Sequence, residues 1–207
     1  MRLELPANRT FFTSDPHFHH TNICKGISKW SDKESCRPYA SLDEMNNELV
    51  KMMNVADVYD HIVCLGDWSF GGIEQITRFR NQIRCQNIYL VLGNHDHHIA
   101  NTSNTDIRQL FATIDKRLHI VLDKQNIICD HYPIISWENM NKGWWHLHGH
   151  VHLPPKYALN KGKSMDVGVD GSSMNLYTFK MLQSILDNQP ISINVLAKDH
   201  HLKEVNY

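Results

Sequence analysis

Apolar runs that end abruptly in short polar clusters are the feature that most constrains this chain. Five such clusters occur, at Asp15-Pro-His17, Gly66-Asp67, Gly93-Asn94-His95-Asp96, Asp130-His131 and Gly149-His150-Val-His152. Several of them follow an apolar run that predicts a buried strand. In open α/β sheets, the loops at the carboxyl ends of strands gather side chains from distant sequence positions. We therefore expect the clusters to meet at one edge of a sheet.

The order of strands and helices predicts the fold class. Eight strands are expected, at Thr10–Ser14, His61–Leu65, Asn87–Leu92, Leu118–Leu122, Ile127–Cys129, Trp145–Leu147, Met165–Val169 and Ile191–Leu196. Helices are expected at Ile73–Ile83, at Leu176–Leu186, and after the capping-box sequence Ser41-Leu-Asp-Glu44, where Leu42, Met45, Leu49, Met52 and Met53 share one face.

Alternation of strands and helices in the first half implies parallel strands joined by helical crossovers. The denser strands after Leu118 imply a second sheet, with a hairpin turn at Asp123–Asn126. The predicted class is an α/β fold, a two-sheet β-sandwich flanked by helices. At 207 residues and 42% hydrophobic, the chain suits a single domain over 1–207, with no separate cap domain.

Charge and cysteine content narrow the function classes. The net charge of -1 provides no bulk attraction to nucleic acid or to an anionic membrane. The five cysteines are odd in number and lack CxxC spacing, which argues against a disulfide framework and predicts a cytoplasmic protein. No apolar run approaches the roughly 18 to 20 residues of a membrane span. We expect no membrane association, and the sequence implies no protein partner.

Asp15 and His17 stand two residues apart, so in an extended segment both side chains project from one face and can share a cation. Asp-Pro also starts turns, and this pair alone has a purely structural interpretation. Asp67 follows His61–Leu65 and Gly66, whose glycine permits a sharp turn after a buried strand. A carboxylate there can bridge two metals with its two oxygens, although Gly-Asp alone is weak evidence.

Gly93-Asn94-His95-Asp96 is the most specific of the clusters. Asn94 offers a neutral oxygen ligand, His95 would lie beside the metals with a proton to donate, and Asp96 would orient that imidazole. A turn-capping asparagine is the competing interpretation. Three consecutive polar side chains rarely follow an apolar strand in a packed core, which favours a functional role for this cluster.

Histidines complete the ligand set. His131, taken alone, fits a core histidine as well as a metal ligand. His150 and His152 alternate, so in an extended segment they point to one side, and Gly149 leaves space for a metal. The clusters together offer carboxylate, imidazole and amide oxygen ligands for two adjacent divalent cations, as in a two-metal hydrolase. Manganese, iron or zinc suits such ligands, and we favour manganese.

The five motifs, in this order, resemble those of the calcineurin-like metallophosphoesterases and span Ser14 to His152. The resemblance implies the metallophosphoesterase fold and a catalytic His95 beside the scissile phosphate. It also implies two sets of metal ligands that share a bridging Asp67: Asp15, His17, Asp67 and His152 for one metal, and Asp67, Asn94, His131 and His150 for the other.

Ser14–Ile23 is similar to the Ser-Asp-x-His-Phe-Gly-His-x-Asn-Ile segment of small bacterial and phage phosphoesterases, with Arg37-Pro38 downstream as in that group. His19 stands where the group usually has glycine. By this resemblance, His20 and Arg37 are candidate phosphate contacts. A guanidinium can fork onto two phosphate oxygens, but an exposed loop charge explains Arg37 equally well.

The predicted activity is hydrolysis of phosphate esters by a hydroxide that bridges two metals. Trp137, Trp144 and Trp145 lie near the His131 and His150 loops, where they would stack on a base or pack under a loop. Stacking favours a phosphodiesterase acting on a nucleotide or nucleic-acid diester. The insertion 22–39, with Trp30, is a further candidate lining of the cleft.

Three alternatives stay open: a phosphomonoesterase acting on a protein or small molecule, a non-catalytic metal-stabilised binding module, and an inactive scaffold of the same family. A nucleic-acid module would favour clustered Lys and Arg with interleaved aromatics, and this pattern is not seen. An inactive scaffold should have lost a ligand, whereas the whole ligand set is present.

Overall fold

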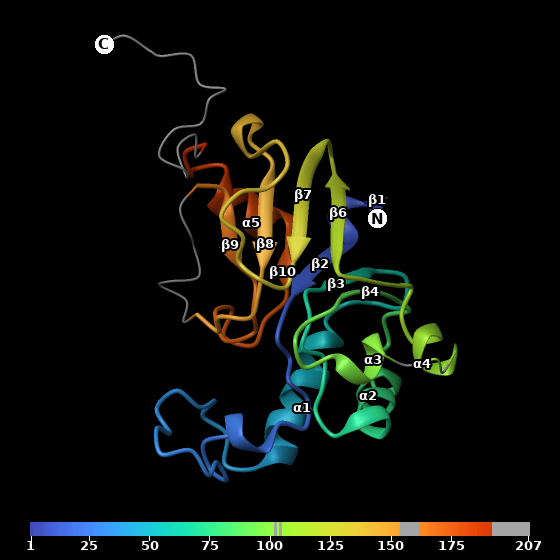
Figure 1. The fold of residues 1–207 in the computed structure, drawn as a ribbon, viewed down its shortest axis with the longest axis vertical. Helices are drawn as coiled ribbons and strands as arrows, with labels where there is room; N and C mark the ends of the chain where they lie inside the picture. The colour runs from blue at the N-terminus through green and yellow to red at the C-terminus, as the bar shows by residue number, and fades with distance from the viewer. Residues whose placement is uncertain (102, 104, 154–161, 192–207) are drawn as a thin grey trace.

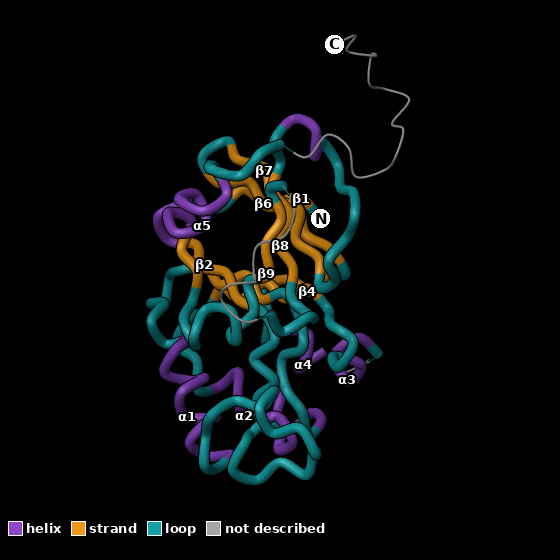
Figure 2. The backbone as a smooth tube through the Cα atoms, turned by 90° about the vertical axis from the view of Figure 1, so that its left-hand side faces the viewer, coloured by secondary structure: helices purple, strands orange, loops and turns teal. Residues whose placement is uncertain are grey.

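Two five-stranded sheets face each other, and helices cover the outer face of one of them (Figures 1 and 2). The computed structural model describes residues 1–101, 103, 105–153 and 162–191. The first sheet has the order β10-β2-β3-β4-β5, with bounds Tyr177–Thr178, Thr10–Thr13, His61–Cys64, Asn87–Val91 and Thr113–Asp115. The second has the order β1-β6-β7-β8-β9, with bounds Arg2–Glu4, Arg117–Leu122, Gln125–Asp130, Trp145–His148 and Ser164–Asp166.

Helical crossovers connect the parallel strands β2, β3 and β4, as predicted. Helix α1 (Leu42–Met53) lies between β2 and β3, and α2 (Gly72–Asn81) lies between β3 and β4. The Ser41 hydroxyl accepts from the Glu44 N–H at 3.2 Å, and the Glu44 carboxylate accepts from the Ala40 N–H at 2.8 Å. The first bond satisfies an N–H group that the first turn leaves unpaired, and the second holds the residue before the N-cap, so α1 begins where the capping pattern predicts.

Alternation along the strands divides the core into two layers. Ile62 and Cys64 of β3 pack with the buried face of α1 and α2, whereas Val63 of the same strand packs between the two sheets. Successive strand residues point to opposite faces, so each central strand joins both layers. Helix α5 (Phe179–Leu186) closes one side of the space between the sheets through Leu182 and Leu186 (Figure 2).

The predicted hairpin connects β6 and β7, and its turn is shorter than expected. Leu122 pairs with Gln125, which leaves Asp123 and Lys124 as a two-residue loop with φ of 45° and 69°. Positive φ at both loop residues defines the turn whose twist matches that of the two strands. The predicted turn ran to Asn126, but β7 already begins at Gln125.

Short elements account for most differences from the prediction. The helix expected at Leu176–Leu186 begins only at Phe179, because Thr178 caps it by accepting from the Met181 N–H, and Tyr177–Thr178 form β10. The edge strands β1 and β5 were not predicted. Of the strand predicted at Ile191–Leu196, all but Ile191 lies outside the described residues. The remaining helical elements are α3 (His97–Ala100), α4 (Thr105–Gln109) and three 3-10 turns, at Ala7–Arg9, Thr21–Ile23 and Met140–Lys142.

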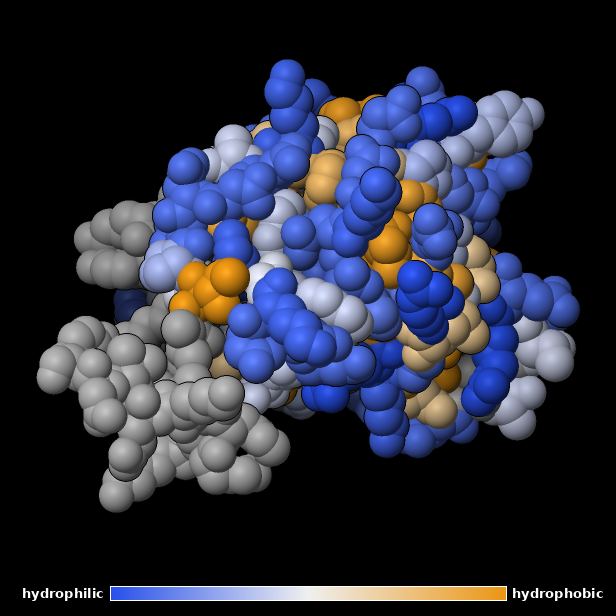
Figure 3. Space-filling view, turned by 90° about the horizontal axis from the view of Figure 1, so that it is seen from above, coloured by the Kyte–Doolittle hydropathy of each residue, from blue (hydrophilic) through white to orange (hydrophobic). Residues whose placement is uncertain are grey.

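The α/β two-sheet sandwich flanked by helices is thus confirmed, while a single domain over 1–207 stays a prediction. All five cysteines are buried and free. Within the described residues, no helix has the length and apolar character needed to cross a membrane. The face in Figure 3 carries mostly hydrophilic side chains between smaller hydrophobic groups.

Candidate metal centre

The seven predicted metal ligands follow strands β2, β3, β4, β7 and β8 and lie together at the carboxyl ends of both sheets. Contacts join them into a closed ring. Around it, His17 contacts His152 and Asp67, Asp67 contacts His131, and Asn94 contacts His131 and His150. The His150 backbone contacts Asp15, and Asp15 contacts His17, which closes the ring. Parallel strands bring these loops to one edge, as the sequence predicts.

The first part of the ring consists of Asp15, His17 and His152. The Nε2 atoms of the two histidines face each other at 3.0 Å, and Asp15 Oδ1 lies 3.8 Å from His17 Nε2 and 3.7 Å from His152 Nε2. Asp15 Oδ1 is buried and has no hydrogen-bond partner among the described residues. An unpaired buried acceptor is costly, so this atom suits coordination to a cation.

The second part of the ring consists of Asn94, His131 and His150. Asn94 Oδ1 lies 2.9 Å from His131 Nε2 and 2.9 Å from His150 Nδ1. His131 Nδ1 lies 2.7 Å from the backbone oxygen of Leu65, to which it can donate. Such a bond leaves Nε2 as the free lone pair aimed at the cluster.

One oxygen of Asp67 lies between the two parts. Its Oδ2 is 3.5 Å from His17 Nε2 and 3.6 Å from His131 Nε2, while Oδ1 accepts from the His95 N–H at 2.8 Å. A bridge through both carboxylate oxygens stays a prediction. Only Oδ2 faces a histidine Nε2 on each side, because Oδ1 accepts from the loop after β4.

Two glycines leave room for these carboxylates. A Cβ at Gly149 would overlap Asp15 Oδ2 and the Ser14 hydroxyl, and one at Gly93 would overlap Asp67 Oδ1. Only glycine permits so close an approach of the backbone.

The backbone of the ligands is unusual. Asp15, His17, Asp67, His150 and His152 have φ values of 54°, 49°, 54°, 70° and 49°. This left-handed region is rare outside glycine, although Asn, Asp and His are several-fold enriched in it. The clustering of such residues at one place is typical of functional sites.

Burial disfavours the charged forms of two of the predicted ligands. Burial raises the pKa of Asp15 to about 6, and burial together with the neighbouring His152 and Arg37 lowers the pKa of His17 well below its usual value. Bound cations would reverse the shift of Asp15 and reinforce that of His17, because they favour the carboxylate and the neutral imidazole. The donor set, the unpaired Oδ1 and the space at the glycines all fit divalent metals.

Asp96 binds the backbone of two loops, and its predicted role at the His95 ring stays a prediction. Its buried carboxylate accepts from the backbone N–H groups of Asp67, Trp68 and Gly93 at 2.8, 2.9 and 2.8 Å. Burial raises the pKa of Asp96, although these bonds oppose the shift. These contacts give no support to the prediction that Asp96 orients the His95 ring. The carboxylate instead ties the loop after β3 to the loop after β4.

His95 itself lies at the opening of the site. Its exposed ring is centred 5.5 Å from the His17 ring and 4.8 Å from that of Phe70. It also lines a cavity of about 1170 Å³ that begins at the predicted metal ligands His17 and His152. The role of His95 as a proton donor to a phosphate ester stays a prediction.

Arg37 is neither a free phosphate contact nor an exposed charge. Its Nε and Nη2 donate to the Asp170 carboxylate at 2.8 and 3.1 Å, and Nη1 and Nη2 donate to the backbone oxygens of Pro16 and Asp15 at 2.7 Å each. The side chain is only 2% exposed. The guanidinium nitrogens are therefore engaged by Asp170 and by two backbone oxygens, and the predicted phosphate contact does not fit this geometry.

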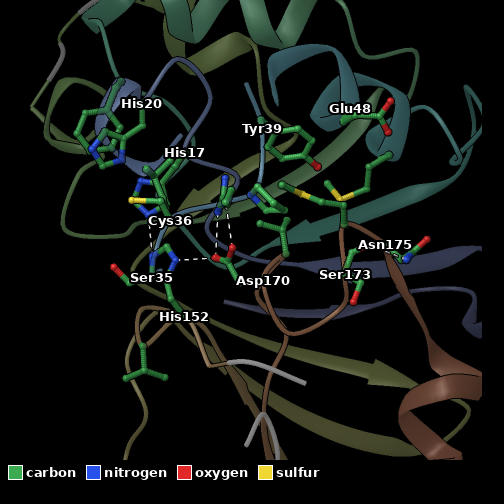
Figure 4. A pocket seen from close by; sticks show the side chains of 18 of the residues that line it. His17, His20, Ser35, Cys36, Tyr39, Glu48, His152, Asp170, Ser173 and Asn175 are labelled. Atoms are coloured by element: carbon green, nitrogen blue, oxygen red, sulfur yellow. Dashed lines mark hydrogen bonds and ion pairs between the residues drawn. The ribbon is translucent and has the colours of Figure 1, made fainter. Parts of the chain in front are cut away.

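Asp170 is a site residue that the sequence analysis missed. Its Oδ2 lies 2.7 Å from His152 Nδ1, which leaves His152 Nε2 facing the cluster (Figure 4). Although burial opposes it, Arg37 and His152 hold the pKa of Asp170 well below its usual range. A carboxylate that orients a ligating histidine in this way is a common feature of metal sites.

His20 lies on the cavity wall beside the ligands. Its ring stacks on Phe70 with centroids 3.8 Å apart. Burial, then the neighbouring His95 and Arg37, lower the pKa of His20 to about 4, so its ring is neutral near pH 7. A phosphate contact from His20 stays a prediction, as a neutral N–H donor.

The three tryptophans proposed to stack on a base lie elsewhere. Trp145 belongs to the core between the sheets, Trp137 is buried and donates to the Trp144 carbonyl, and Trp144 packs against His119. None of them is among the described residues that line the cavity. The insertion 22–39 does line it, through Trp30 and Tyr39 among others.

A family model described as calcineurin-like phosphoesterase matches residues 9–200, and the chain belongs to this family. The protein is accordingly a metal-dependent phosphoesterase, a hydrolase of a family that uses a dinuclear divalent metal centre.

Relatives are distant. The uncharacterised protein MJ1445 of Methanocaldococcus jannaschii is 25% identical over 201 residues, or 94% of this chain and 92% of the relative. The crystal structure of AQ665 from Aquifex aeolicus, a protein of unknown function, is 17% identical with a TM-score of 0.58, covers 88% of this chain and 100% of its own, and supports the fold alone. A novel archaeal phosphodiesterase is 16% identical with a TM-score of 0.44 over 77% of this chain and 81% of its own, too low to bear on function.

Proposed function

We propose that the protein is a phosphodiesterase that hydrolyses a nucleotide or nucleic-acid diester with two divalent cations, manganese being favoured over iron and zinc. One cation is held by Asp15, His17, Asp67 and His152, and the other by Asp67, Asn94, His131 and His150. Two such cations lower the pKa of a water molecule and stabilise the charge of a phosphoryl group in the transition state. The five free cysteines agree with the reducing cytoplasm we propose as its location.

The engagement of Arg37 is the observation that favours diesters over monoesters. A phosphomonoester carries up to two negative charges near pH 7, and a diester carries one. A free guanidinium would favour the more highly charged ester through two charge-assisted hydrogen bonds. Arg37 already donates to Asp170 and to two backbone oxygens, so this extra stabilisation is not offered. The singly charged ester therefore fits the site better.

His95 donates a proton to the departing oxygen. Its exposed ring stands at the opening of the cavity, and its backbone N–H is held by Asp67 Oδ1 at 2.8 Å. Asp96 contributes indirectly, because it positions the backbone of both loops that carry Asp67 and His95. Asp170 and Arg37 act as positioning residues for His152.

A pair of chromogenic substrates tests this function. With manganese added, we expect kcat/KM for bis(p-nitrophenyl) phosphate to exceed that for p-nitrophenyl phosphate by roughly tenfold or more, the scale of one lost charge-assisted contact. The purified protein should hold close to two metal ions per chain, and Asp67→Asn should lose both metal and turnover. Faster hydrolysis of the monoester would overturn the preference, and a metal-saturated protein inactive on both esters would overturn the function.

A further inference from the structure

The cavity at the metal ligands extends far beyond the space that a phosphate needs. Its volume of about 1170 Å³ exceeds the roughly 300 to 1,000 Å³ that typical small-molecule sites occupy. It begins at His17 and His152 and continues along the insertion 22–39 to Glu48 of α1 and Asn175, which Figure 4 shows on the side away from the two histidines. Part of the substrate larger than its phosphate must therefore fit there.

One wall of the cavity is aromatic. The Phe70 ring lies 4.8 Å from the His95 ring and stacks on His20, and Trp30 meets His20 edge-on at 5.8 Å. All of these side chains line the cavity. The aromatic surface thus starts beside the proposed proton donor and leads outward through the insertion. Flat π-faces of this kind bind bases without sequence preference.

The rest of the lining includes apolar side chains, among them Met52 of α1, Val55 in the turn after α1, and Val169 and Met174 between β9 and β10. Methionine side chains adapt to flat ligands and make favourable contacts with aromatic rings. Polar groups gather farther out, where Glu48, Ser173 and Asn175 line the cavity. A ligand with an aromatic body and polar groups at its edge matches this change from apolar to polar lining.

Charge in the cavity opposes a second phosphate. Its described lining includes two cations, Arg37 and Lys51, and three carboxylates, those of Glu34, Glu48 and Asp170. Arg37 is engaged by Asp170, and Lys51 Nζ lies 3.4 Å from Glu48 Oε1. A strand of nucleic acid needs a cationic track for each successive phosphate, and these residues do not form one.

We propose that the cavity binds one nucleoside of a small diester, with its base against the Phe70–Trp30 wall and with the scissile phosphate as the only charged group of the ligand that enters. This inference deepens the proposed function and rests on it, because it requires the phosphate to lie at the metal ligands. It narrows the substrate to a compact nucleotide ester and excludes a continuous polynucleotide from this cavity.

Calorimetry on the manganese-loaded protein tests the nucleoside site with methyl phosphate, thymidine 5′-monophosphate and thymidine 3′,5′-bisphosphate as probes. We expect thymidine 5′-monophosphate to bind roughly tenfold or more tighter than methyl phosphate, the effect of one stacked base. The bisphosphate should bind about threefold weaker than the monophosphate, as modest repulsion at partly exposed carboxylates predicts.

Variants separate stacking from structural effects. Trp30→Ala should weaken the binding of thymidine 5′-monophosphate roughly tenfold and leave the binding of methyl phosphate unchanged. Trp30→Phe should restore most of the affinity for thymidine 5′-monophosphate. Tyr59→Ala, at an aromatic residue that is 71% exposed and not among the cavity residues, is the matched control and should change neither. Glu48→Gln should release Lys51 and abolish the discrimination against the bisphosphate.

Equal binding of methyl phosphate and thymidine 5′-monophosphate would overturn the nucleoside site, as would tighter binding of the bisphosphate or an equal loss for both ligands in Trp30→Ala. Hydrolysis of bis(p-nitrophenyl) phosphate is measured alongside on the same preparations. Turnover without nucleoside selectivity would refute this inference alone. Nucleoside selectivity without turnover would refute the proposed function and leave the binding site standing.

Discussion

Replacing Arg37 by methionine should destabilise the protein far more than the same change at Arg9. Both arginines form an ion pair in which Nε lies 2.8 Å from an aspartate Oδ1, Asp170 for Arg37 and Asp60 for Arg9. The Arg37 side chain is 2% exposed, whereas that of Arg9 is 45% exposed. The two pairs thus share the Nε–Oδ1 contact, and they differ in burial and in the further hydrogen bonds that only Arg37 makes.

The magnitude follows from what each change leaves behind. Removing one partner of a buried pair costs about 3 to 5 kcal/mol, and since the Asp170 side chain retains 21% exposure we take the lower end, about 3 kcal/mol. An exposed pair contributes about 0.5 kcal/mol. With a denaturant dependence of about 3 kcal/mol per M, the urea midpoint should fall by about 1 M for Arg37→Met and about 0.2 M for Arg9→Met.

Urea titration of both variants and of the wild type, in EDTA and followed by tryptophan fluorescence, measures these midpoints without a contribution from bound metal. Manganese titration of the same proteins should show weaker binding, by roughly ten- to a hundredfold, only in Arg37→Met, because Asp170 then loses the partner that holds it against His152. Equal shifts of the urea midpoint in the two variants, with unchanged slopes, would refute the reasoning from burial.

Three further predictions concern the metal centre. His95→Ala should lower turnover by roughly 10² to 10⁴ while retaining two metals per chain, and Asp67→Ala should lose both; wild-type turnover in His95→Ala on the true substrate would contradict the proton-donor role. Gly149→Ala should lower the bound manganese measured by elemental analysis, because its Cβ would overlap Asp15 Oδ2, and a full metal complement would disprove the steric argument. Burial raises the pKa of Asp15 to about 6, so in the metal-free protein its contribution to stability is largest below about pH 4 and is lost as the pH rises through 6. The free energy of unfolding of the wild type minus that of Asp15→Asn should therefore fall by about 2 kcal/mol between pH 4 and 7, and a constant difference would contradict the assignment.

The sequence predicted those parts of the fold whose cause is local. Strands β2, β3 and β4 are apolar runs that end in turn residues, and the site follows because parallel strands end at one edge. Strand β1 has no such signal, since Arg2–Glu4 contains a single apolar residue. It exists because the backbone of β6 offers it a pairing edge, with Arg2 opposite His119. Tertiary pairing of this kind overrides local propensity.

The arrangement around Arg37 was beyond sequence reasoning for a similar reason. Arg37 and Asp170 are 133 residues apart, and a buried ion pair at that separation leaves no periodic pattern. A signal for Asp170 did exist. It directly follows the predicted strand Met165–Val169 and precedes Gly171, much as Asp67 follows His61–Leu65 beside Gly66. The same rule applied to every predicted strand would have included it.

The left-handed backbone at Asp15, His17, Asp67, His150 and His152 limits how this centre can be redesigned. Exchanging a ligand for glutamate or cysteine, in order to select another metal, would place in that conformation a residue type that tolerates it less well than Asp, His or Asn. The cost, on the order of 1 kcal/mol or more per position, would accumulate over neighbouring loops. Metal preference is therefore more readily altered through residues behind the ligands, such as Asp170, than through the ligands themselves.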